Sequence, residues 1–420
     1  MQNKSLLFVD RLDFYNQLLF ENAKECGLNT IVLSPKPSKP YEYVDYFYQC
    51  ENWNDDGEIL KKIDEITKAH RVDGVTTFDE HSIQICAKIC EKLRLPGITP
   101  QAANNARNKY LMRKAFVKHN VPSPRYQLIK QRSDLDSLTI EFPVVVKPVC
   151  GSGSMGVCKA INLDELKEYF DRVKAIAQSI SYRNDDGEKE YSDYLLVEEY
   201  IEGREVCIEA LTYKGDTNIV VIQDEPGKSG RYFAESTFTT PSTFPPEIQN
   251  AIREIAARAV KALGITTGPT HIELTIPDDM TPVVIEIGAR VGGYGLFHNA
   301  VYYSRGIKYL KEIYKTRLDI EPDLKSRCDF VVGNVFLRAE PTRPSTIVRM
   351  LGLEEIRKLE GVKYVVLVAK PGDRVIPLPE GRAGGACGSV YVQTETHEEN
   401  RAVLDEIGRL FKVELSDSSN

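Results

Sequence analysis

Short hydrophobic runs alternate with amphipathic stretches along the first hundred residues. Apolar runs at 5–9, 30–33 and 72–78 predict strands, and apolar residues at helical spacing in 14–26, 59–69 and 82–93 predict helices between them. Gly27 follows the first of these helices and Pro96-Gly97 the last, where helices commonly end. The alternation predicts a small parallel sheet with helices on its faces.

Strands and helices are mixed beyond residue 100. The pattern predicts helices at 108–119, 164–177, 246–263 and 398–411, and strands at 142–149, 157–161, 194–197, 205–212, 217–223, 330–337, 364–368 and 389–394. Two apolar runs, 271–276 and 283–287, flank Pro277-Asp278-Asp279 and predict a hairpin. Residues 184–191 are polar and are expected to form a loop. The chain is therefore expected to be an α/β protein of several domains.

Composition narrows the class of protein. The 420 residues carry 54 Lys and Arg against 61 Asp and Glu, a net charge of -7, which argues against a nucleic-acid binder. No apolar run approaches the ~18 residues of a membrane span, so no membrane partner is expected. The 9 cysteines lie mostly inside apolar runs, which favours reduced thiols and a cytoplasmic location.

A glycine-rich stretch follows the apolar strand at 142–149. Gly151, Gly153 and Gly156 have the spacing G-x-G-x-x-G, with Ser152 and Ser154 between them. A dinucleotide-binding fold would need a helix directly after these glycines, whereas here a strand is expected. The stretch is therefore interpreted as a flap whose backbone N–H groups cover phosphates. Lys147 in the preceding strand either meets such a phosphate or lies at a surface edge.

A second apolar strand ends in Glu198-Glu199-Tyr200-Ile201 and is followed by Glu205 at the start of another strand. Its backbone groups could meet the edge of a purine, and Glu205 could accept hydrogen bonds from ribose hydroxyls. The alternative is a charged hairpin without a ligand.

Acidic residues interrupt both strands of the predicted hairpin. Glu273 and Glu286 would be costly to bury unpaired, and their oxygens suit Mg²⁺, which also binds nucleotide phosphates. Arg290 follows at a distance that lets it reach a developing anion. A structural Glu–Arg pair is the alternative. Glu80, at the end of a predicted strand of the parallel sheet, belongs either to a ligand site or to a polar turn.

Together these features resemble the ATP-grasp superfamily, over essentially the whole chain. The resemblance implies a Rossmann-like N-terminal domain (1–98), two ATP-grasp subdomains (99–192 and 193–319) and a C-terminal α/β domain (320–420). It implies ATP and Mg²⁺, with two ions expected and Mn²⁺ as an alternative.

The resemblance also implies roles for single residues. The segment Asn108-Lys109-Tyr110-Leu111-Met112-Arg113 looks like the family's first phosphate-binding lysine segment, so Lys109 and Lys147 would contact the ATP phosphates. The remaining ATP-binding residues would be Gly151, Ser152, Gly153, Ser154, Gly156, Glu198, Glu199, Tyr200, Ile201 and Glu205. Glu273 and Glu286 match the metal ligands and Arg290 the catalytic arginine. Gly288 stands where many members carry Asn, the usual third metal contact.

Within this superfamily the sequence is most similar to the L-amino acid ligases, which make dipeptides. The likeness lies in Gln101-Ala102-Ala103, Glu235-Ser236-Thr237, Thr270-His271-Ile272-Glu273 and Ala289-Arg290. It implies a substrate pocket, to which we assign Glu80, Glu235, Phe238, Arg290, Gly293 and Tyr294. Phe238 replaces a His and Tyr294 a Trp of that subfamily, which bears on substrate choice and not on the reaction.

The sequence thus predicts an ATP-dependent ligase that joins a carboxylate, expected to be that of an amino acid, to an amino-acid amine through an acyl phosphate. Small-molecule carboxylates and amines would be its partners, and a homodimer is left open. One alternative is an ATP-grasp kinase or a ligase of another substrate. A nucleotide-binding regulator without turnover is the other.

Overall fold

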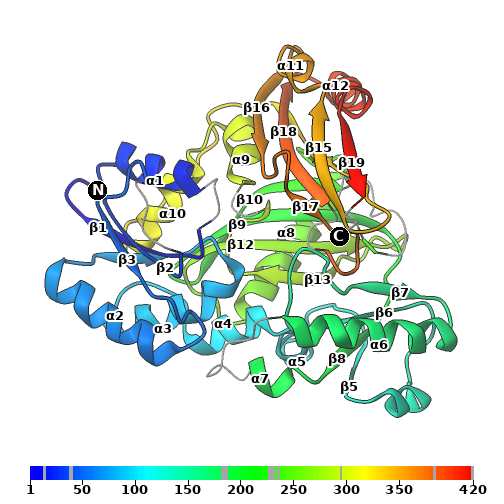
Figure 1. Cartoon of the computed structure of the whole chain (residues 1–420). Helices are drawn as coiled ribbons and strands as arrows, with labels where there is room; N and C mark the ends of the chain where they lie inside the picture. The colour runs from blue at the N-terminus through cyan, green and yellow to red at the C-terminus, as the bar shows by residue number, and fades with distance from the viewer. Residues whose placement is uncertain are drawn as a thin grey trace.

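The computed structural model describes residues 1–12, 16–36, 41–180, 188–225, 232–233, 237–293, 296–381 and 385–417. The strands of these residues form four sheets, and helices pack against the sheets (Figure 1). The predicted mixed α/β fold class is confirmed.

The N-terminal unit contains a parallel sheet in the order β3-β2-β1-β4. Its strands are Ser5–Val9 (β1), Asn29–Ser34 (β2), Tyr46–Gln49 (β3) and Gly74–Thr76 (β4). Successive side chains of a strand point to opposite faces, so Leu6 and Phe8 join one core cluster while Leu7 and Val9 join another. The predicted parallel sheet, buried on both faces, is confirmed.

Helices from two distant parts of the chain cover this sheet. On one face lie α1 (Asn16–Glu25) and α10 (Tyr309–Arg317), and on the other α2 (Asp56–Ala69) and α3 (Ile83–Leu93). Helix α10 lies far from α1 in the chain but packs beside it, as its yellow ribbon next to the blue N-terminal helix shows (Figure 1). The N-terminal unit is therefore fixed to the rest of the molecule by a shared core.

A second, antiparallel sheet has the order β5-β8-β6-β7. It consists of Tyr126–Ile129 (β5), Leu195–Glu199 (β8), Val144–Pro148 (β6) and Cys158–Ala160 (β7). Helix α6 (Leu163–Ser179) covers one face, and α4 (Pro100–Arg107) and α5 (Lys109–Lys118) lead into the sheet. Because β8 pairs with β5 and β6, this sheet extends past the domain boundary predicted at residue 192.

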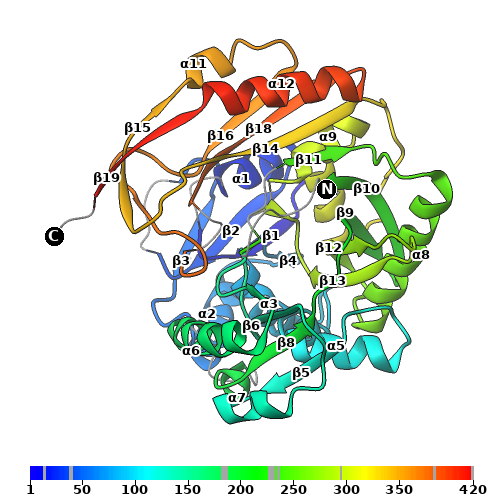
Figure 2. The same cartoon turned by 90° about the vertical axis from the view of Figure 1, so that its right-hand side faces the viewer.

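The largest sheet has eight strands in the order β13-β12-β9-β10-β11-β14-β18-β16. The strands are β13 (Val283–Gly288), β12 (Gly268–Ile276), β9 (Arg204–Tyr213), β10 (Asp216–Glu225), β11 (Thr237–Thr240), β14 (Val331–Arg338), β18 (Ala386–Thr394) and β16 (Val362–Leu367). Helix α8 (Pro246–Ala262) packs near its β13 end and α12 (His397–Leu410) against β14 and β18 (Figure 2). The sheet continues without a break across the boundary predicted at residue 319.

The C-terminal part adds a three-stranded sheet in the order β17-β15-β19. These strands are Arg374–Val375 (β17), Ser345–Leu351 (β15) and Lys412–Asp417 (β19). The remaining α-helices are α7 (Glu188–Tyr191), α9 (His298–Arg305) and α11 (Leu353–Ile356), and short 3₁₀ helices span Glu80–Ser82 and Arg132–Ser137. Of the loop predicted at 184–191, residues 184–187 lie outside the described residues, and the rest forms α7.

Two further expectations from the sequence concern membrane-spanning helices and the pairing of cysteines. None of the helices in the described ranges is long and apolar enough to cross a lipid bilayer. Cys86 and Cys90, the only cysteines close together in the sequence, are buried on α3 among apolar side chains and form no disulfide.

Candidate active site

One cleft collects most of the predicted site residues. It measures about 1930 Å³ including its open mouth and lies between the N-terminal unit, the second sheet and the large sheet. The predicted residues that line it are Glu80, Lys109, Lys147, Gly151, Ser152, Gly153, Ser154, Glu198, Glu199, Tyr200, Ile201, Glu205, Glu273, Glu286, Arg290 and Gly293. Gly156 and Phe238 do not line it, and Glu235 and Tyr294 lie outside the described residues.

The two acids proposed as metal ligands face each other across the predicted hairpin. Glu273 on β12 is directly opposite Glu286 on β13, so both carboxylates stand on the same face of the sheet. The described part of the chain contains no group of three His, Cys, Asp or Glu that could hold a metal by itself. Mg²⁺ usually keeps several waters and binds one or two carboxylates together with substrate phosphates, so this facing pair fits it.

Both predicted phosphate-binding lysines are held by carboxylates. Lys109, the first residue of α5, places Nζ 2.7 Å from Glu286 Oε1 and 3.3 Å from the carbonyl oxygen of Gly151. Lys147 Nζ lies 2.5 Å from Glu198 Oε2, and Arg113 Nε lies 2.7 Å from the other oxygen of Glu198. Lys109 thus connects the metal-site acid to the glycine-rich loop.

The carboxylate of Glu198 is bound within the protein. Burial raises the pKa of Glu198, but Arg113 and Lys147 outweigh burial and lower it, so the group stays ionised. Burial in turn lowers the pKa of Lys147, and Glu198 opposes that effect only in part. The side chain of Glu198 therefore holds Lys147 and Arg113.

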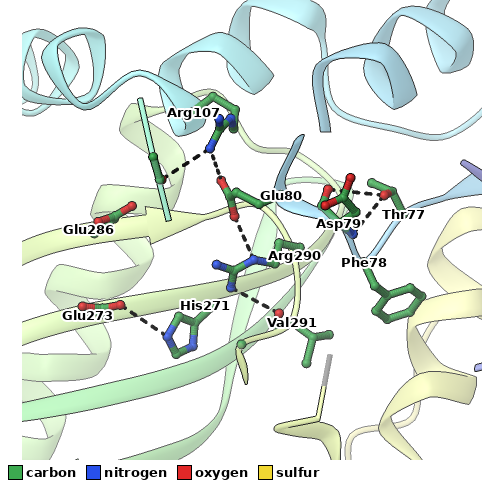
Figure 3. Close-up of polar contacts among 12 residues, drawn as sticks. Thr77, Phe78, Asp79, Glu80, Arg107, His271, Glu273, Glu286, Arg290 and Val291 are labelled. Atoms are coloured by element: carbon green, nitrogen blue, oxygen red, sulfur yellow. Dashed lines mark hydrogen bonds and ion pairs between the residues drawn. The ribbon is translucent and has the colours of Figure 1, made fainter. Parts of the chain in front are cut away.

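Arg290 is held by an acid from the N-terminal unit. Its Nε lies 2.8 Å from Glu80 Oε2, and Arg107 Nη1 lies 3.3 Å from Glu80 Oε1 (Figure 3). Burial raises the pKa of Glu80, but Arg290, Arg107 and Lys109 outweigh it and lower the pKa. Glu80 was predicted to bind substrate, and in the structure its carboxylate joins the buried guanidinium of Arg107 to that of Arg290, which lines the cleft.

A buried acid and an imidazole hold the hairpin that carries Glu273 and Glu286. Glu209 Oε1 accepts hydrogen bonds from the backbone N–H of Gly292 at 3.0 Å and from His271 Nδ1 at 2.8 Å. His271 Nε2 lies 3.7 Å from Glu273 Oε1. Burial lowers the pKa of His271, but its two carboxylate partners raise it to about 9, so the imidazole is cationic at neutral pH. The cation thus joins Glu273 to the turn that follows Arg290.

Most of the glycine-rich loop borders the cleft, and neighbouring units hold its end. Gly151, Ser152, Gly153, Ser154 and Met155 line the cleft. The N–H of Gly156 donates to the carbonyl of Pro379 at 2.8 Å, and the Ser154 hydroxyl donates to that of Phe233 at 3.1 Å. A Cβ on Gly156, whose φ is +73°, would meet Pro148 Cγ at 2.9 Å. This glycine therefore serves the turn of the loop, not direct contact with a ligand.

We expect nucleotide to slow backbone hydrogen exchange in residues 150–157. Glycine and serine offer few side-chain contacts, whereas phosphate oxygens would accept hydrogen bonds from the backbone N–H groups. Exchange followed by mass spectrometry, with and without ADP and Mg²⁺, measures the effect, and a peptide from α8 serves as the internal control. Equal exchange of 150–157 in both states would contradict the assignment of this loop to phosphates.

Phe238 lies in the core and not in the substrate pocket as predicted. Along β11 exposure alternates, and Phe238 takes an inward position, with 1% of its surface exposed. Its ring packs edge-on against Phe297 and Phe336, with ring centroids 5.0 Å and 5.9 Å away. These two rings do line the cleft, so Phe238 supports the cleft wall without forming it.

Replacement Phe238→Ala is therefore expected to cost about 3–5 kcal/mol of unfolding free energy and to leave the ranking of substrates unchanged. Denaturant unfolding and catalytic efficiencies over an amino-acid panel test the two halves of this expectation. A reordered panel with unchanged stability would restore Phe238 to the substrate pocket.

Sequence reasoning missed several residues of this site. Arg113, Arg107 and Glu209 hold Glu198, Glu80 and His271, yet each belongs to a helix or strand whose pattern indicates only packing. An acid within the apolar run of β9 was a usable signal for Glu209, of the same kind that indicated Glu273. The C-terminal strands also contribute unpredicted lining residues, Phe336, Arg338 and Ser389.

Comparison with known proteins identifies the fold. Residues 140–297 match the ATP-grasp domain and residues 20–97 the ATP-grasp N-terminal domain. The chain thus contains an ATP-grasp domain preceded by an ATP-grasp N-terminal domain, and the predicted resemblance to the ATP-grasp superfamily is confirmed. Residues 339–416 match the L-amino acid ligase C-terminal domain 2, which supports the predicted resemblance to the L-amino acid ligases.

Individual relatives agree with this assignment. The crystal structure of the L-amino acid ligase from Bacillus licheniformis superposes with a TM-score of 0.88 at 26% identity, covering 99% of this chain and 100% of that one. Alanine–anticapsin ligase of Bacillus subtilis (strain 168) is 29% identical over 274 residues, which cover 62% of this chain and 57% of that relative. The L-arginine-specific L-amino acid ligase of Bacillus subtilis is 23% identical over 370 residues, or 85% of each chain.

Proposed function

We propose that this protein is an ATP-dependent ligase that forms an amide bond between the carboxylate of one amino acid and the amine of another, releasing ADP and phosphate. The observation that carries the proposal is the facing pair Glu273 and Glu286 in one cleft with Lys109, Lys147 and Arg290. Similarity to L-amino acid ligases supports amino acids as the substrate class.

In the first step, a carboxylate oxygen attacks the γ-phosphorus of ATP. The bond from the γ-phosphorus to the bridging oxygen breaks, ADP leaves with that oxygen, and an acyl phosphate remains. Lys109 and Lys147, which line the cleft with the glycine-rich loop, balance the negative charge of the phosphates. Mg²⁺ held by Glu273 and Glu286 would neutralise phosphoryl charge and fix the phosphate orientation.

In the second step, the amine nitrogen of the other substrate attacks the acyl carbon. The tetrahedral adduct expels phosphate, and the nitrogen loses its surplus proton to solvent. Arg290 donates hydrogen bonds to the acyl phosphate and to the adduct's oxyanion, and Glu80 fixes the direction of that guanidinium. ATP activates the acid, so the cleft needs no nucleophilic side chain.

The experiment that tests the proposal is a screen of amino-acid pairs for ADP and phosphate release, with products identified by mass. Release of phosphate that requires the amine supports a ligase. Phosphorylation of the acid without any need for an amine would support the kinase, and nucleotide binding without ADP release in any pair would support the regulator.

We also propose a cytoplasmic location. The buried thiols of Cys86 and Cys90 are free, which supports a reducing compartment.

A further inference from the structure

The C-terminal unit contributes a wall of the cleft that the ATP and metal assignments leave unused. Strands β14 and β18 supply Phe336, Arg338, Ala386, Gly388 and Ser389 to this wall. Arg338 is the last residue of β14, and its guanidinium carbon lies 5.5 Å from the centroid of the Phe336 ring. A cation beside aromatic and small side chains is a different environment from the carboxylate-rich phosphate side of the cleft.

A β-bulge lies where Arg338 enters the cleft. The register pairs Leu337 with Gly388 but Arg338 with Ala386, so Cys387 is an additional residue on β18. Bulges bend a strand and re-aim its side chains, and they occur often beside active sites. The residues opposite this end of β14 are Ala386 and Gly388, whose small size leaves room for a guanidinium group.

The other lysine and arginine side chains among the described lining residues are engaged on the phosphate side of the cleft. Lys109, Lys147 and Arg290 form ion pairs with Glu286, Glu198 and Glu80 and are assigned to ATP and the acyl phosphate. Arg338 has a further contact of its own within the protein, but a guanidinium carries five N–H donors and can hold a second partner. Its planar fork matches a carboxylate, which it can bind through two parallel hydrogen bonds.

Joining two amino acids leaves one carboxylate unreacted. The acyl donor loses its carboxylate to the acyl phosphate beside Arg290, whereas the amine donor keeps its own. On the basis of the ligase function proposed above, we propose that Arg338 binds the unreacted α-carboxylate of the amino acid that supplies the amine. This contact directs the amine nitrogen toward the acyl carbon and selects amino acids over simple amines.

A comparison of each amino acid with its carboxamide tests the proposal, because the carboxamide lacks the charge that Arg338 would bind. For a pair found in the screen, the wild type should use the amino acid about 50-fold more efficiently than its carboxamide, through a lower KM. Arg338→Met should reduce the efficiency with the amino acid to the level of the carboxamide and leave the KM for ATP unchanged. Arg338→Lys should keep part of the preference. Arg349→Met, which removes an exposed guanidinium of β15 paired with Glu414, is the matched control and should change none of these values.

The outcomes separate this proposal from the ligase function itself. Equal losses for the amino acid and its carboxamide, or a loss confined to ATP, would overturn the role of Arg338. Calorimetric titration of L-alanine, L-phenylalanine and their carboxamides, in the presence of ADP and Mg²⁺, extends the comparison to binding. A preference for the amino acid that Arg338→Met removes, in a protein without ligase turnover, would keep the subsite and reject the reaction. If the wild type shows no such preference in binding or turnover, the proposal fails.

Discussion

Replacement of Glu286 by glutamine is expected to reduce turnover about a thousandfold while the fold remains intact. Glu286 is one of only two acids that face each other on the β12–β13 hairpin, and it also binds Lys109 at 2.7 Å. Glutamine keeps the size of the side chain but removes the negative charge that Mg²⁺ requires. A metal ion contributes several kcal/mol to phosphoryl transfer, and each 1.36 kcal/mol corresponds to about a factor of ten in rate.

Three measurements make this expectation specific. ADP release gives the rate, calorimetry gives the affinity for Mg²⁺ with ADP, and denaturant unfolding gives the stability. Glu254→Gln is the control, because its acid lies on α8, its side chain is 74% exposed and it is outside the cleft. Near-normal turnover of Glu286→Gln at saturating Mg²⁺ would exclude this residue as a metal ligand.

The loss of Lys109's partner could also lower activity, so a second variant separates the two causes. Glu273→Gln removes the facing acid, whose Oε1 lies 3.7 Å from His271 Nε2. Both variants should weaken Mg²⁺ binding if the two acids share a metal. A defect in Glu286→Gln alone would instead trace the effect to Lys109.

Much of this fold could be predicted because it depends on local patterns. The continuous apolar run of β1 and the helical periods of α2 and α3 indicate a parallel sheet buried on both faces. Opposed acids in two neighbouring apolar strands indicated the Glu273–Glu286 pair from the sequence, since the hairpin between them is short. These features need only the residues of one segment.

Contacts between distant segments could not be predicted in this way. Helix α10 completes the core of the N-terminal unit about 280 residues further along the chain, and no periodicity indicates which sheet it covers. Strands β9–β14, β18 and β16 form a single sheet, which extends across the boundary that the family resemblance suggested at residue 319. Phe238 was assigned to a pocket by position in a motif, whereas the strand alternation of β11 turns it into the core.

The role of Glu80 depends on such a long-range contact. It joins the N-terminal unit to Arg290, the arginine to which we assign a role in the proposed reaction. Glu80 follows β4, Arg107 ends α4 and Arg290 follows β13, so three separate segments meet in one buried network (Figure 3). Gly288 makes room for this network, because a Cβ there would lie 3.2 Å from Arg290 Cζ and 3.3 Å from Glu80 Oε2. The position where many family members carry Asn is therefore kept small here by an ion pair.

Replacement of Glu80 by glutamine is expected to lower kcat about a hundredfold and to cost about 3 kcal/mol of unfolding free energy. The variant leaves Arg107 and Arg290 without the carboxylate that they share. The charge of Arg107 is buried, and breaking one partner of a buried pair is strongly destabilising. Arg290 then loses its fixed direction toward the acyl phosphate, and a lost or misplaced donor at a developing oxyanion costs roughly 100- to 1000-fold. The KM for ATP should change little, because the lysines of the phosphate side remain in place.

The control must lose a buried acid without touching Arg290. Asp56→Asn does so in the same N-terminal unit, where Asp56 is 4% exposed, forms an ion pair with Lys88 and lies outside the cleft. The stability of this variant should fall while kcat is kept, which separates damage to the fold from damage to the site.

Gly288→Ala tests the same network through another residue. It should also lower kcat, because the added Cβ would crowd Arg290. If Glu80→Gln instead raises the KM for an amino acid and leaves kcat intact, Glu80 binds substrate directly, and the positioning role assigned to it here is wrong.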